Sequence, residues 1–162
     1  MNKYIIDTSS LIELKDKYPR DIFKSLWTNL ENLINERRIQ APKQVYEEIK
    51  RQEDELTNFI DNHKQKLFID IDNDKEIMEE FGRIIRDYPR LIDHRKEDGD
   101  CADPYIIALA KIYTKRLNVG RIIVVTEDRK NKGKISIKYV CNEENITCIT
   151  LIELFREEGW EF

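Results

Sequence analysis

The sequence predicts a three-layer α/β/α fold with a central, mostly parallel sheet flanked by helices. One observation is that short, wholly apolar runs occur at residues 4–6 and 122–125, which is typical of strands buried in a parallel sheet. A second is that segments with helical periodicity separate such runs, as the crossovers between parallel strands require. The third is the length of 162 residues, which suits a single domain over residues 1–162.

The first half of the chain is expected to alternate helices with short strands. Helices are expected at 8–15 and 20–37, on either side of Pro19. In the second of them, leucines at 26, 30 and 33 recur at helical spacing. Residues 39–41 are expected to form a strand, and Pro42 suits the first turn of the helix that follows.

The second half is expected to contain a helical extension, at about residues 53–100, and a buried central helix. The extension holds a continued helix at 53–66, an apolar run at 67–69, an acidic helix at 74–86 and a polar loop from Pro89 to Gly99. Residues 104–113 are apolar on nearly every face, which indicates a helix in the centre of the domain. The prediction ends with strands at 122–125, 135–140 and 146–149 and a helix at 151–157.

Composition places the chain among soluble globular proteins, because 40% of the residues are hydrophobic and 37% are charged. The apolar runs are too short to cross a membrane, and the first residues show no export signal. Cys101, Cys141 and Cys148 form no CxxC pair, so we expect reduced core thiols in a cytoplasmic protein. The net charge of −4 argues against a broad basic surface for nucleic acid.

Four acids stand where a parallel sheet would bring them together. They are Asp7, Glu48, Asp103 and Asp128. Asp7 and Asp128 follow apolar strands directly, and the carboxyl ends of neighbouring strands meet in the crevice where such folds bind ligands. Carboxylates held close repel one another unless a divalent cation neutralises them, and oxygen ligands favour Mg²⁺ or Mn²⁺. The pattern predicts a metal-binding nuclease site.

Each acid also has a purely structural interpretation. Asp7 could cap the following helix, and the hydroxyls of Thr8, Ser9 and Ser10 could orient it. Asp103 precedes Pro104, so that the pair is typical of an N-cap and a first-turn proline.

Two of the positions have a competing neighbour. On the helix after Pro42, Glu47 points nearly opposite to the buried face, whereas Glu48 lies at its margin and is the better candidate. Glu127 competes with Asp128 in a Thr-Glu-Asp segment that could also be an ordinary turn.

In order and rough spacing, these motifs resemble those of the PIN-domain nucleases, which include the toxin ribonucleases of type II toxin–antitoxin pairs. The matching segments are Tyr-Ile-Ile-Asp-Thr-Ser-Ser-Leu-Ile, Val-Tyr-Glu-Glu-Ile, Asp-Pro-Tyr-Ile-Ile-Ala-Leu-Ala and Val-Thr-Glu-Asp. The resemblance implies that Asp7, Asp103 and Asp128 bind the metal, that Glu48 orients the attacking water, and that Thr126 supports the site. The stretch between the second and third acids is longer here than is usual in that family.

The resemblance implies a Mg²⁺- or Mn²⁺-dependent endoribonuclease, a toxin with an antitoxin partner, and a homodimer. A basic loop after Asp128 could bind the phosphates beside the cut, although it could equally be a solvated loop. Its cations are Arg129, Lys130, Lys132 and Lys134. The alternative is a catalytically inactive PIN-like module that binds RNA or protein. A phosphatase is disfavoured because Ser9 stands where an Asp-x-Asp motif needs its second acid.

Overall fold

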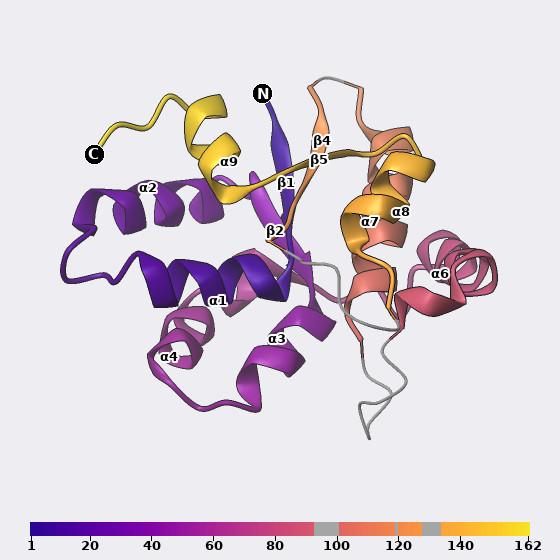
Figure 1. Ribbon diagram of the computed structural model, residues 1–162, viewed down its shortest axis with the longest axis horizontal. Helices are drawn as coiled ribbons and strands as arrows, with labels where there is room; N and C mark the ends of the chain where they lie inside the picture. Colours follow the sequence, from indigo (N-terminus) through magenta and orange to yellow (C-terminus); the bar gives the residue numbers. More distant parts are fainter. Residues whose placement is uncertain (93–100, 119, 128–133) are drawn as a thin grey trace.

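The computed structural model describes residues 1–92, 101–118, 120–127 and 134–162, and within them it contains a five-stranded, all-parallel sheet. The strand order is β3-β2-β1-β4-β5, with β1 in the centre (Figure 1). The strands are β1 (Lys3–Ile6), β2 (Ile39–Pro42), β3 (Phe68–Ile69), β4 (Ile122–Val125) and β5 (Thr147–Ile149).

Helices cover both faces of this sheet, so that the predicted three-layer α/β/α fold is confirmed. Figure 1 shows α1, α2, α4 and α9 on one side of the strands and α6, α7 and α8 on the other. None of the helices in the described ranges is long and apolar enough to cross a membrane. The helices are α1 (Thr8–Lys17), α2 (Lys24–Asn35), α3 (Lys43–Lys50), α4 (Glu55–Asn62), α5 (Lys64–Leu67), α6 (Lys75–Asp87), the 3-10 helix η1 (Pro89–Leu91), α7 (Asp103–Arg116), α8 (Ile137–Glu143) and α9 (Leu151–Glu157).

The two central strands are buried along almost their whole length. Tyr4, Ile5 and Ile6 of β1 are 0% exposed, and they pair in register with Ile123, Val124 and Val125 of β4. Because helices cover both faces of the sheet, these strands have no solvent-facing side on which polar residues would be expected. This explains why the strands appear in the sequence as unbroken apolar runs.

Helix α7 is the central helix that the sequence predicts. It contacts β1, β2 and β4 as well as α6 and α8, and the run from Ile106 to Ala110 is completely buried. Its N-terminus carries Asp103, with Ala102 as the N-cap residue. The expectation that Asp103 is the N-cap was therefore wrong by one position. The acid belongs to the first turn, where the helix dipole favours a negative charge.

The predicted strand at 135–140 is wrong, because this segment is largely the helix α8 (Ile137–Glu143). The Ser136 hydroxyl caps the helix by accepting a hydrogen bond from the Tyr139 N–H at 3.1 Å. Ile137, Val140 and Cys141 are buried at helical spacing, although alternating isoleucines also suit a strand. The sheet decides between the two patterns, since β4 and β5 are parallel neighbours and need a crossover between them.

The extension after residue 53 is only partly helical, which refines the prediction. Its apolar run forms β3, which pairs with β2 and becomes an edge of the sheet. The helix expected at 53–66 is interrupted at His63 and forms α4 and α5. On α4, Phe59 packs edge-on against Trp27 of α2, with ring centroids 4.9 Å apart. The end of the extension, residues 93–100, lies outside the described residues.

Candidate active site

Three of the four predicted acids, Asp7, Glu48 and Asp103, gather at the carboxyl end of the sheet, beside its topological switch point. The central strand β1 has β2 on one side and β4 on the other, so the chain leaves β1 and β4 in opposite directions and a crevice opens between them. A cleft of about 360 Å³ lies at this end. Its lining residues are Asp7, Thr8, Ser9, Ile12, Glu48, Arg51, Gln52, Cys101, Asp103 and Lys134.

Asp7 is the buried centre of this cleft and also caps α1. Its side chain is the N-cap of that helix and accepts a hydrogen bond from the Ser10 N–H at 2.9 Å. The Ser9 hydroxyl lies 2.9 Å from both carboxylate oxygens, and the Thr126 hydroxyl donates to Oδ2. The predicted cap and the predicted support by Ser9 and Thr126 are both present. The expected support by the Thr8 hydroxyl was wrong, because this hydroxyl makes no hydrogen bond to the described residues. Capping fixes the carboxylate without removing it from the cleft.

The electrostatic environment disfavours the ionised form of Asp7. The residue is only 2% exposed, and this burial raises its pKa to about 7, although the Thr126 hydroxyl opposes the shift. Asp103 lines the same cleft, and its negative charge raises the pKa of Asp7 further. Among the described residues, no lysine or arginine pairs with Asp7. A cation bound from solution would reduce the free-energy cost of burying the ionised carboxylate.

Asp103 reaches the cleft from the first turn of α7 and pairs with a lysine. Lys134 Nζ donates to Asp103 Oδ2 at 2.6 Å, and the two side chains are only 11% and 15% exposed. Lys134 therefore points into the cleft, whereas the sequence suggested a loop residue facing flanking phosphates. Arg129, Lys130 and Lys132 of the predicted basic loop lie outside the described residues.

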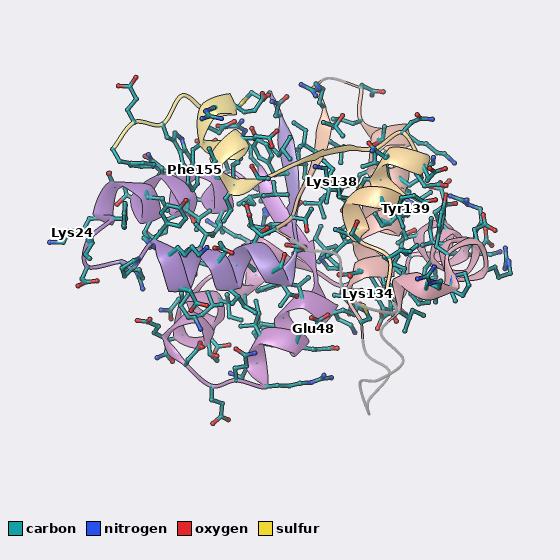
Figure 2. All side chains as sticks on the ribbon, viewed as in Figure 1. Lys24, Glu48, Lys134, Lys138, Tyr139 and Phe155 are labelled. Carbon is teal, nitrogen blue, oxygen red and sulfur yellow. The ribbon has the colours of Figure 1, made fainter. Side chains whose placement is uncertain are left out.

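Glu48 connects helix α3 to the start of α7. Its Oε1 accepts a hydrogen bond from the Ala102 N–H at 2.6 Å, which satisfies a backbone donor just before α7. Glu47, at the preceding position of the helix, is exposed and does not line the large cleft. Figure 2 shows Glu48 and Lys134 at the same end of the molecule, and both line the cleft. The expected orientation of Glu48, at the margin of the buried face, is thus confirmed.

Glu127 has a structural role that separates it from the cleft. Its carboxylate accepts a hydrogen bond from the Leu151 N–H at 2.7 Å and so satisfies a donor at the start of α9. Its own N–H donates to the Ser9 hydroxyl at 3.1 Å. Of the two competing acids, Asp128 lies outside the described residues, so its predicted place in the site stays a prediction.

Four lining residues, Ile12, Arg51, Gln52 and Cys101, were not predicted from the sequence. Arg51 and Gln52 follow Glu48 by three and four residues, at the C-cap of α3 and just beyond it, and this spacing brings the chain back to the side of Glu48. The spacing was a signal that could have identified them. Burial raises the pKa of the Cys101 thiol to about 11, with a further contribution from Asp103. Cys101 is therefore a neutral thiol and unsuited to be a nucleophile.

The cleft fits a divalent cation by the chemistry of its donors. Asp7 is a buried carboxylate without a basic partner in the described chain, and Asp103 is a second carboxylate beside it. The hydroxyl of Thr8 is buried in the same cleft and makes no hydrogen bond to the described residues. A buried hydroxyl of this kind is costly unless a ligand or water meets it. Within the described ranges, however, no group of three or more acids, histidines or cysteines is arranged around one ion position.

Fold and cleft together define an α/β protein with an acidic site at the switch point of a parallel sheet. The chain belongs to the family DUF4411, a domain of unknown function, because the model of that family matches residues 4–162. The matched range contains Asp7, Glu48 and Asp103. No curated protein matches the chain.

Proposed function

We propose that this protein is a Mg²⁺- or Mn²⁺-dependent endoribonuclease that hydrolyses phosphodiester bonds of RNA. The observation that carries the proposal is Asp7, a carboxylate that is 2% exposed and lies with Asp103 in a cleft at the switch point. Among the described residues, its hydrogen-bond partners are hydroxyl and backbone groups. A protein gains nothing in stability from such a carboxylate when it is ionised and unpaired. The free-energy cost of burying this carboxylate is explained if Asp7 binds a cation when the protein is active.

In this proposal, Asp7 and Asp103 hold the cation, and Asp128 is the third ligand expected from the sequence. A bound divalent ion would lower the pKa of its water and neutralise charge on the phosphate. The protein's own side chains would orient the groups that bind the metal and the water. Ser9, Ser10 and Thr126 hold the Asp7 carboxylate in one orientation, and we assign to Glu48 the positioning of the attacking water.

The direct test is incubation of the purified protein with a mixture of structured and unstructured RNAs. We expect cleavage with Mg²⁺ or Mn²⁺ and none with a chelator, and the cleavage should return when the metal is restored. Cleavage that continues in excess chelator would remove the proposal. If the protein is a toxin, its expression should arrest growth, and co-expression of an antitoxin from a neighbouring gene should relieve the arrest.

A second candidate is a catalytically inactive module that binds RNA or protein. It is favoured by the absence of a three-ligand metal group within the described ranges and by the fact that three acids already make structural contacts. Asp7 caps α1, Glu48 holds Ala102, and Asp103 pairs with Lys134. This candidate predicts RNA binding that is indifferent to chelator and is not followed by cleavage.

Variants of Glu48 separate its structural contact from its charge. Glu48→Gln keeps an oxygen that can accept from the Ala102 N–H, so we expect the melting temperature to change little while cleavage falls about 10-fold or more. Glu48→Ala leaves the Ala102 N–H without this partner, so the free energy of unfolding should drop by about 1–3 kcal/mol. Thermal unfolding and initial cleavage rates measure the two effects. The neighbouring Glu47→Gln, on the exposed side of α3, is the matched control and should alter neither.

A further inference from the structure

The two carboxylates of the cleft differ in how their charges are balanced. Asp103 already has a cation from the chain, because Lys134 Nζ lies 2.6 Å from its Oδ2. Asp7 is held by Ser9, Ser10 and Thr126, which bring no charge. Both members of the Asp103–Lys134 pair are largely shielded from solvent, at 15% and 11% exposure, so that salt screens their attraction much less than it screens a surface pair.

The backbone around Lys134 directs this side chain into the cleft. The next residue, Ile135, donates its N–H to the Arg90 carbonyl at 3.0 Å and so joins the segment to η1. Ser136 then caps α8. Lys134 is therefore anchored on its C-terminal side by two elements of the fold, and it lines the acidic cleft.

We propose that Lys134 is a resident cation of the site, so that the cleft binds one divalent ion, on the Asp7 side, and not two. Nucleases with two ions place them about 3.5–4 Å apart between shared carboxylates, where together they balance the charge of acids and phosphate. A lysine ammonium bound to Asp103 supplies one of those positive charges permanently.

The inference rests on the proposed function, since it requires that Asp7 binds a divalent ion. It also gives Lys134 a different role from that of a phosphate-binding loop residue. A loop lysine would change the affinity for RNA and leave metal binding alone. A resident cation would change how many metal ions the protein binds, even when no RNA is present.

The test is titration of the metal-free protein with Mn²⁺ by isothermal calorimetry, without RNA. We expect one ion per wild-type chain. The uncharged, similarly sized Lys134→Met should bind a second ion, or bind the first with an affinity at least about tenfold higher, because a repelling charge is removed and Asp103 loses its ion pair with Lys134. Lys134→Arg keeps the charge and should again bind one ion.

Lys15→Met is the matched control, because Lys15 is also a partly buried lysine in an ion pair, 2.9 Å from Asp54 and 18% exposed, but outside the cleft. It should bind Mn²⁺ as the wild type does. Two ions in the wild type would overturn the inference even if Lys134→Met failed to fold. One ion in Lys134→Met, at an affinity within about tenfold of the wild type or weaker, would overturn it too. If the wild type bound no Mn²⁺ at all, the proposed function itself would fall.

Discussion

Replacement of Asp7 by asparagine should reduce metal-dependent RNA cleavage by about 100-fold or more, because the most buried carboxylate of the cleft is lost. The fold should survive the change. Asparagine is as good an N-cap as aspartate, and its oxygen can still accept from the Ser10 N–H, while its amide can donate to the Thr126 hydroxyl. Initial cleavage rates with Mg²⁺ and with Mn²⁺, at saturating and limiting metal, measure the effect.

Asp74→Asn is the matched control for this experiment. Asp74 caps α6 through a hydrogen bond from the Ile77 N–H at 3.2 Å, just as Asp7 caps α1, but it lies away from the cleft. Its asparagine variant should cleave RNA at nearly the wild-type rate. Equal cleavage by the wild type and Asp7→Asn would show that Asp7 is only a cap, and the assignment of the site would be wrong.

The second large effect is a loss of stability of the metal-free protein as the pH rises from 5 to 8. The pKa of Asp7 is about 7 in the folded protein and has its ordinary value of 3.8 when the chain is unfolded. Between these values the folded state keeps a proton that the unfolded chain releases, so raising the pH favours unfolding. Across this window the wild type should lose about 2 kcal/mol relative to Asp7→Asn, which has no such proton.

Glu144, another acid with a shifted pKa, does not obscure this window. Burial alone would raise the pKa of Glu144, but hydrogen bonds from Arg83 and Tyr88 outweigh it and lower the pKa to about 2. The stability that Glu144 contributes is thus lost only as the pH falls below its ordinary value of 4.5. Denaturant unfolding of both proteins at several pH values between 5 and 8, in a chelator, measures the difference.

Divalent metal should reverse the loss, because it binds the ionised form of Asp7 in the folded state. At pH 8 the addition of Mn²⁺ should raise the melting temperature of the wild type and leave that of Asp7→Asn unchanged. Parallel pH profiles for the two proteins would contradict the shifted pKa. An equal shift with Mn²⁺ would instead show that the ion binds elsewhere.

Much of the fold could be predicted because local patterns and the global arrangement agree. The unbroken apolar runs at β1 and β4 occur only where helices cover both faces of a strand, and the all-round apolar α7 can lie only in the interior. The secondary-structure prediction was wrong where one segment fits both the two-residue period of a strand and the 3.6-residue period of a helix. Residues 135–140 alternate like a strand and also repeat like a helix, and only the parallel pairing of β4 with β5 requires the helix.

The candidate site was predictable in part for the same reason. A residue that directly follows a central parallel strand must lie at the carboxyl edge of the sheet, so the position of Asp7 follows from the strand itself. Glu48 could be chosen over Glu47 by helical angle. The partners of these acids could not be predicted in the same way, because they come from distant segments. Glu127 binds the start of α9, and Lys134 binds the start of α7.

Chain order and hydrophobic period alone therefore established the α/β/α architecture and the edge of the sheet where acids collect. The folded molecule decided which charges meet there, namely that Asp103 is neutralised by Lys134 whereas Asp7 is buried with hydroxyl and backbone partners. The physical reason is range. Hydrophobic periodicity depends on residues that are close in the sequence, so it can be recognised from the sequence alone. The energy of a charged side chain depends on its burial and on groups that are distant in the sequence.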